Sequence, residues 1–138
     1  MPAKDIYHDA VVAALTKDGW TITHDPLRLQ MGKRDAYVDL GAERLLAAEK
    51  EGRKIGVEVK SFVGASVLRD LEQALGQFTL YETIMTRVEP DRKLYVALRA
   101  DVYDSLFEEP LGKALLEDSR IRLMVFEPLT EEIVKWID

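Results

Sequence analysis

A strand, a long helix and a second strand follow one another within residues 54–98, and this order limits the chain to an α/β architecture. Residues 54–60 alternate apolar and polar side chains, which is the period-two pattern of a β-strand. Residues 94–98 are a continuous apolar run bounded by charge, which is typical of an interior strand covered on both faces. Between them, Ser66 is a suitable cap for a helix that we expect to run to about Arg87. Its expected apolar stripe is Leu68, Leu71, Leu75, Phe78 and Met85.

The flanking sequence adds helices and short strands to this unit. Asp5 is a candidate cap for a first helix, and Gly19 is suited to closing it. We therefore predict one α/β domain over residues 1–138, with a mixed β-sheet flanked by α-helices. The further elements expected are a helix at 5–19, strands at 20–24, 27–31, 121–126 and 133–137, and two short helices separated by Pro110.

Residues 42–50 present a conflict between local rules. Their composition, rich in Ala, Leu, Glu and Lys, favours a helix. The strand-like residues 37–40 precede them, however, and Glu51-Gly52 has the character of a hairpin turn. We favour a strand that pairs with residues 54–60, because a hairpin supplies an edge for so regular an alternation.

The composition excludes several classes of protein. The hydrophobic set makes up 47% of the 138 residues and charged residues 32%, as in ordinary globular domains. The absence of cysteine excludes disulfides, thiolate metal sites and a cysteine nucleophile. No apolar run approaches the roughly 20 residues of a membrane span, and the N-terminus lacks a signal peptide's apolar stretch. We therefore expect a cytoplasmic protein without membrane contact.

The net charge of -6 argues against non-specific coating of nucleic acid, which needs an array of cations. The charge is unevenly distributed, however. Residues 1–70 hold 11 basic and 11 acidic residues, whereas 71–138 hold 8 and 14. The first half includes the pairs Lys33-Arg34 and Arg53-Lys54, so a polyanion is expected to meet this half. Solvated turns are the alternative explanation for each pair.

Glu58-Val59-Lys60 is the sharpest candidate for chemistry. Two residues apart on a strand, the carboxylate and the ammonium project from one face, and Asp39 follows a strand-like segment 19 residues earlier. Asp39 and Glu58 would suit Mg²⁺ (or Mn²⁺), while Lys60 would orient or deprotonate a water or offset phosphate charge during phosphodiester hydrolysis. The alternative is that Glu58 and Lys60 form only the outward polar side of an amphipathic strand.

Other polar residues are weaker candidates. Gln73 and Gln77 share one helix face that would point toward this site. Glu43 and Glu49 are possible further metal ligands, although a solvated hairpin explains them better. The residues assigned to packing or to the surface in preference to a functional role are His8, His24, Phe126 and Trp136.

The segments YVDLGAERLLAAEKEGRKIGVEVKSF, DLEQALGQFTLYE, EPDRKLYVALRADVYD and LMVFEPLTEEIVKWI resemble the XisH family. The arrangement Asp39, Glu58-Val59-Lys60 and a following helix is similar to the PD-(D/E)xK nuclease superfamily. This resemblance implies a restriction-endonuclease-like core with α-β-β-β-α-β order and C-terminal additions, and a strand at 43–49. It carries the nuclease motif over to Asp39, Glu58 and Lys60, with the auxiliary glutamine at Gln73 or Gln77.

The XisH resemblance further implies control of the excision of the fdxN element from cyanobacterial DNA during heterocyst development, beside a small XisI-like protein and a site-specific recombinase. Two hypotheses follow. The protein is a Mg²⁺-dependent DNA endonuclease, as the acid–acid–lysine set indicates, or it is a non-catalytic control factor that acts through protein and DNA contacts. Cutting both strands symmetrically would favour a homodimer.

Overall fold

The structure is a computed structural model that describes residues 6–32, 34–35 and 45–138. Its helices are α1 (His8–Lys17), α3 (Val67–Val88), α4 (Ala100–Leu106) and α5 (Pro110–Glu117). Its strands are β1 (Thr21–His24), β2 (Gln30–Met31), β3 (Arg34–Asp35), β4 (Leu45–Lys50), β5 (Arg53–Val59), β6 (Arg92–Arg99), β7 (Leu123–Glu127) and β8 (Glu132–Ile137). Within the described ranges, none of the helices combines the length and apolar character that a membrane crossing requires.

Six of the described strands form one mixed sheet in the order β1-β4-β5-β6-β7-β8, while β2 and β3 form a separate ribbon. β5, β6 and β7 are parallel, because α3 leads the chain from the end of β5 back to the start of β6 and α4 and α5 do the same for β7. The outer pairs are antiparallel and each contains a register shift, between Ile22 and His24 in β1 and opposite Val125 and Phe126 in β8. The predicted α/β fold with a mixed sheet is confirmed.

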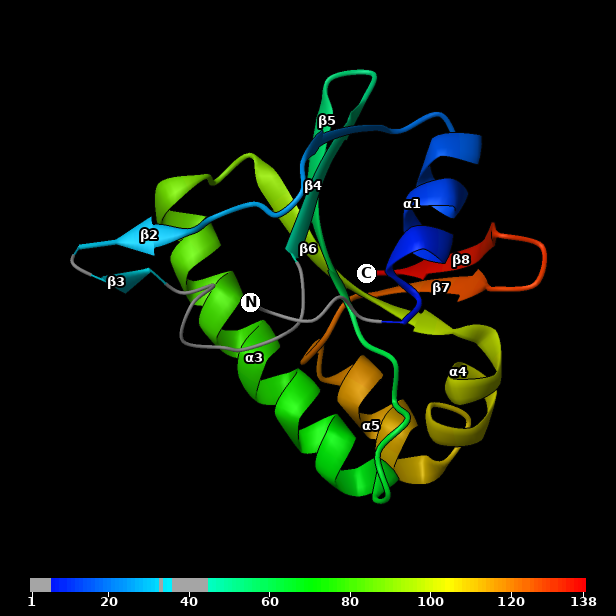
Figure 1. The fold of residues 1–138 in the computed structure, drawn as a ribbon. Coiled ribbons are helices and arrows are strands. Elements are labelled where there is room, and N and C mark those ends of the chain that lie inside the picture. Colours follow the sequence, from blue (N-terminus) through cyan, green and yellow to red (C-terminus); the bar gives the residue numbers. More distant parts are fainter. Residues whose placement is uncertain (1–5, 33, 36–44) are drawn as a thin grey trace.

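Helices cover both faces of this sheet (Figure 1). α1 lies on one face, and α3, α4 and α5 lie on the other. Alternate residues of β6 therefore enter different cores: Tyr95 and Ala97 pack on the α1 side, and Leu94 and Val96 pack on the α3 side. The expectation of an interior strand covered on both faces is confirmed.

The conflict over residues 42–50 is decided for the part that the structure describes. Residues 45–50 form β4, and the register pairs Leu45 with Glu58 and Lys50 with Arg53. Glu51 and Gly52 both have left-handed φ values, 52° and 80°, as a two-residue hairpin turn requires. All four residues from Leu45 to Ala48 are buried, because β4 lies between β1 and β5 and is covered on both faces. Tertiary burial thus overrides helix propensity.

Two local expectations need correction, and a third concerns a residue that the structure does not describe. Only Gln30–Met31 of the expected strand 27–31 is a strand, and Leu27 and Leu29 are buried in the core on the α3 side. Leu68 is 55% exposed and is not part of the apolar stripe of α3. The proposed cap Asp5 lies outside the described residues, whereas the Ser66 side chain does cap α3 by accepting from the Arg69 N–H. The buried residues of α3 are Leu71, Ala74, Phe78, Tyr81 and Met85.

The two C-terminal aromatics are packing residues, as the sequence indicated. Phe126 is fully buried, and the Trp136 ring lies edge-on to Tyr95 with ring centroids 4.9 Å apart. Trp136 also lies 5.7 Å from Trp20 by ring centroids, so the core beneath α1 includes the last strand.

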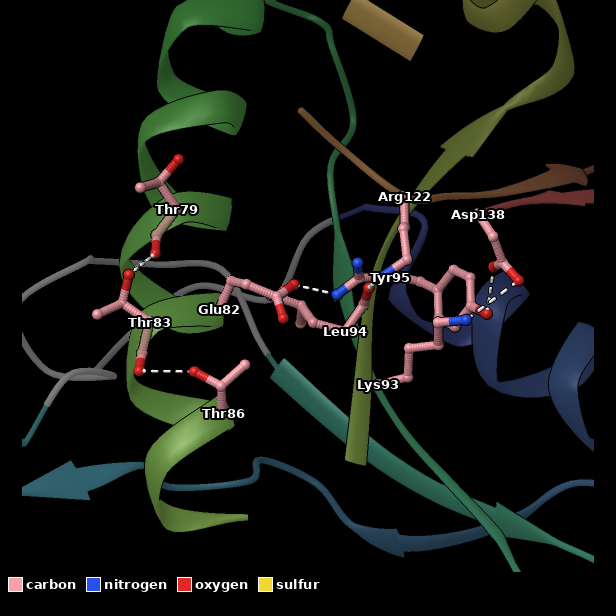
Figure 2. A network of polar contacts seen from close by, with 9 residues as sticks. All are labelled: Thr79, Glu82, Thr83, Thr86, Lys93, Leu94, Tyr95, Arg122 and Asp138. Carbon is pink, nitrogen blue, oxygen red and sulfur yellow. Dashed lines mark hydrogen bonds and ion pairs between the residues drawn. The ribbon is translucent and has the colours of Figure 1, made fainter. Parts of the chain in front are cut away.

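A polar network ties α3 and the last residue to the middle of the sheet (Figure 2). Arg122 pairs with Glu82 of α3 and donates through Nε to the Leu94 carbonyl at 3.1 Å. On the other face, the Tyr95 hydroxyl donates to the Asp138 carboxylate at 2.5 Å. Burial, assisted by this carboxylate, raises the pKa of Tyr95, and the hydrogen bond from Tyr95 lowers the pKa of Asp138.

Gly112→Ala should lower the free energy of unfolding by about 2 kcal/mol or more, because a Cβ at this position would lie 2.2 Å from the Leu106 carbonyl oxygen, a backbone atom. The matched control is Gly76→Ala in α3, where no atom lies within 4 Å of the added Cβ. That variant should gain about 0.5–1 kcal/mol from helix propensity. Urea unfolding of both variants measures the contrast, and equal stabilities would contradict it.

Tyr95→Phe should flatten the dependence of stability on pH above about pH 10. The pKa of Tyr95 is raised above the value of about 10 for an unfolded tyrosine. Its contribution is therefore complete below about pH 10 and is lost as the pH rises beyond it. Tyr103→Phe on α4, whose ring stacks on Phe107, is the control and should keep the wild-type slope. Urea unfolding at a series of alkaline pH values tests this, and identical slopes for Tyr95→Phe and wild type would contradict it.

Candidate functional site

Glu58 and Lys60 lie at the carboxyl end of β5 and face α3. Side chains alternate along a strand, so Val57 and Val59 enter the core beneath α1 while Glu58 and Lys60 point to the other face. Only 1% of Glu58 and 5% of Lys60 is exposed to solvent. The interpretation of these residues as an outward, solvated side of the strand is therefore wrong.

A carboxylate, an ammonium and an amide lie in a row between β5 and α3. Lys60 Nζ is 3.6 Å from Glu58 Oε1 and donates a hydrogen bond to Gln77 Oε1. The Lys60 backbone N–H donates to the Ala97 carbonyl at 3.0 Å, so the lysine is also fixed against β6. Of the two glutamines that the sequence indicated, Gln77 contacts the lysine, and Gln73 is exposed one turn earlier.

A small polar pocket opens beside Lys60, where the chain leaves β5 and enters α3. It has a volume of about 130 Å³. Its lining residues are Lys60, Ser61, Phe62, Val63, Gly64, Asp70 and Gln73. Of the buried pair, Lys60 therefore lines a pocket and Glu58 does not.

Asp70 lines this pocket and binds the Gly64 backbone. The sequence did not indicate a role for this residue. Its Oδ2 accepts a hydrogen bond from the Gly64 N–H at 3.0 Å. A Cβ at position 64 would lie 2.6 Å from Asp70 Oδ1, so a larger residue there would displace the Asp70 carboxylate. The only signal was the position of Asp70 in the first turn of the helix that Ser66 caps, a spacing too common to identify a site.

The predicted metal ligands are only partly described. Asp39 and Glu43 lie outside the described residues. Glu49 pairs with Lys54, four residues along β4 from the Leu45–Glu58 pair, which places it about 13 Å from the site. In the ranges that the structure covers, no group of three or more His, Asp or Glu residues could hold a metal ion. The carboxylate of Glu58 suits a hard cation, and its pairing with Asp39 stays a prediction.

Neither histidine belongs to this site. His8 is buried on α1, and its Nε2 lies 2.8 Å from Asp25 Oδ2. His24 is exposed at the end of β1, where its Nδ1 lies 3.1 Å from Thr23 Oγ1. The structure thus confirms packing and surface roles for them.

The chemistry that this arrangement permits follows from its burial. The Glu58 carboxylate is nearly dry, and its charge is offset by the Lys60 ammonium, which donates a hydrogen bond to the Gln77 amide oxygen. A lysine ammonium fixed at the edge of a pocket is a point charge suited to a phosphate or carboxylate oxygen.

Known proteins resemble this chain over almost its whole length. A family model described as XisH protein matches residues 1–134. The crystal structure of an XisH family protein from Nostoc punctiforme has 36% identity and a TM-score of 0.88, and the match covers 97% of this chain and 100% of that one. The crystal structure of an fdxN element excision controlling factor protein from Anabaena variabilis has 38% identity and a TM-score of 0.87, with 97% and 99% covered. No match was found among proteins with curated descriptions.

Lys60→Met should lower the free energy of unfolding by about 3 kcal/mol, because it leaves the buried Glu58 carboxylate without its ammonium. The double variant Glu58→Gln/Lys60→Met, which removes both charges, should recover part of this loss. Lys93→Met, which breaks the exposed pair with Asp138, is the control and should cost at most about 1 kcal/mol. Urea unfolding of the variants tests the comparison, and equal costs for the two lysines would contradict it.

Proposed function

The chain belongs to the XisH family, and from this membership we propose that it controls the excision of a DNA element. The relative from Anabaena variabilis is described as an fdxN element excision controlling factor, and the match spans 99% of that chain at 38% identity. Similarity over the whole length supports transfer of the role and not merely of a shared fold. In this proposal, the site acts on the DNA that is rearranged.

The finer proposal is a restriction-endonuclease-like core with a nuclease-type site. Its support is the order α1, hairpin β4–β5, α3 and β6, with the acidic residue and the lysine at the end of β5. The observation that carries it is the buried pair Glu58 and Lys60, which the partly buried Gln77 contacts, beside a small pocket. Burying a charge pair lowers the stability of a protein unless the pair is well compensated. A functional site that needs a dry carboxylate and a fixed ammonium would be a reason to keep such a pair.

In this proposal each side chain has one task. Glu58, together with Asp39, would hold Mg²⁺ or Mn²⁺. The bound ion would polarise a phosphoryl oxygen and lower the pKa of a water. Lys60 would orient that water or offset charge on the phosphate, and Gln77 would position the Lys60 ammonium through the hydrogen bond already formed.

A non-catalytic control factor is the second candidate. Its support is the acidic second half of the chain, residues 71–138, where 14 acidic residues face 8 basic ones and would suit a protein partner better than a polyanion. In this case the protein would act through DNA and through contacts with an XisI-like protein, a site-specific recombinase or a second copy of itself. Co-purification with an XisI-like protein at micromolar concentration tests the partner, and failure to associate would count against it.

The nuclease proposal predicts that purified protein cleaves supercoiled, linear or branched DNA when Mg²⁺ or Mn²⁺ is added, and that EDTA stops the reaction. Glu58→Gln and Lys60→Ala should each reduce the rate at least about 100-fold, and Gln77→Ala should reduce it less. Glu72→Gln, on the exposed side of α3, is the control and should cleave like wild type. Gel electrophoresis of the products measures the rates, with thermal unfolding as a check on folding. Absence of cleavage on all three substrates would leave the control factor as the remaining function. Full activity of Lys60→Ala would show that the cleavage does not come from this site.

A further inference from the structure

The turn between β4 and β5 places two positive charges directly opposite each other. Lys50 and Arg53 are register partners on either side of Glu51-Gly52, so their side chains share one face of the hairpin. Both lie over the ring of Trp20, with Lys50 Nζ 6.0 Å and Arg53 Cζ 5.4 Å from the ring centroid. Like charges in directly opposite positions are destabilising, so this pair has a cost in the isolated protein.

The cations at this turn are only partly neutralised. Lys50 Nζ lies 3.6 Å from Asp18 Oδ2. Arg53 and Lys54 are exposed, and within residues 6–32, 34–35 and 45–138 no carboxylate lies within 4.0 Å of either. The Trp20 ring fixes the Arg53 guanidinium through its face but supplies no negative charge. Glu49 is the register partner of Lys54, but among the described residues neither Arg53 nor Lys54 forms an ion pair, and Lys50 shares one carboxylate.

We propose that this turn, formed by Lys50, Arg53 and Lys54, binds the phosphate backbone of nucleic acid. A row of phosphates would relieve the repulsion within the Lys50–Arg53 pair, which no single carboxylate of the turn achieves. In Figure 1 the β4–β5 turn stands at the end of the hairpin, at the top of the view.

An anionic lipid surface is the competing polyanion, and the turn is poorly suited to it. Proteins that bind membrane surfaces combine cations with apolar side chains that enter the lipid. The exposed large hydrophobic residues of the described chain lie elsewhere, and none lies between positions 45 and 60. The choice of nucleic acid rests in addition on the proposed role in DNA rearrangement.

The turn is separate from the Glu58–Lys60 row. Arg53 and Glu58 are five residues apart on β5, which corresponds to about 17 Å along a strand. Substitutions at the turn should therefore change DNA affinity without changing the carboxylate, ammonium and amide at the other end. On bound DNA, the distance between the turn and the Glu58–Lys60 site would correspond to about half a helical turn.

The test is fluorescence anisotropy of a labelled duplex of about two helical turns, titrated with the full chain in EDTA between about 50 and about 200 mM salt. Arg53→Gln/Lys54→Gln should weaken binding about tenfold at low salt. It should also reduce the slope of log affinity against log salt by about 2, close to 0.9 for each lost phosphate contact. Lys113→Gln/Arg120→Gln removes the same charge from exposed positions of α5 and the segment after it, and should leave both quantities near wild type.

The outcomes separate this inference from the proposed function. If wild type binds DNA and Arg53→Gln/Lys54→Gln binds with unchanged affinity and slope, the turn is not the contact, while a DNA-directed function stands. If wild type binds no DNA, this inference is wrong, and the proposed control of excision would have to act through protein contacts. If wild type instead binds phosphatidylserine-containing vesicles through these residues and not DNA, the lipid interpretation replaces this one. Thermal unfolding of each variant confirms that the comparison is between folded proteins.

Discussion

The burial of a charge pair on the central strand is the constraint on which the arrangement of this protein depends. Glu58 and Lys60 point into the space between β5 and α3, where 1% and 5% of their surfaces remain exposed. Ions removed from water must be compensated at close range, and here Lys60 and Gln77 provide that compensation. Helix α3 therefore cannot be replaced by any apolar cover, since it must place an amide oxygen at one position above the sheet.

The two faces of β5 consequently make different demands on the rest of the chain. The α1 side requires only shape, because Ile55, Val57 and Val59 are apolar. On the α3 side, Gly56 leaves room for Met85, whose Cε would lie 2.9 Å from a Cβ at position 56. Met85 packs over Gly56, and Gln77 accepts from Lys60, so α3 contacts this face of β5 through both an apolar and a polar side chain.

The sequence predicted much of this arrangement, and its failures share one physical cause. The alternation of 54–60 and the spacing of α3 are local patterns, so the strand, the helix and its Ser66 cap were found correctly. Burial of the polar side of β5 was not predicted, because it depends on how α3 packs across the sheet, which the local sequence pattern does not specify. The choice of Gln77 over Gln73 and the role of Asp70 depend in the same way on the rotation of a packed helix.

The register shifts in the outer strand pairs decide how another chain can engage this sheet. A regular edge strand exposes a row of backbone donors and acceptors that can pair with a strand of another molecule and start aggregation. β1 has four residues and irregular pairing between Ile22 and His24, and β8 has irregular pairing opposite Val125 and carries the exposed Lys135. Neither edge of the described sheet is a good template for strand addition. A protein partner is therefore expected to recognise side chains, which makes the association sensitive to single surface substitutions and limits self-assembly through the sheet.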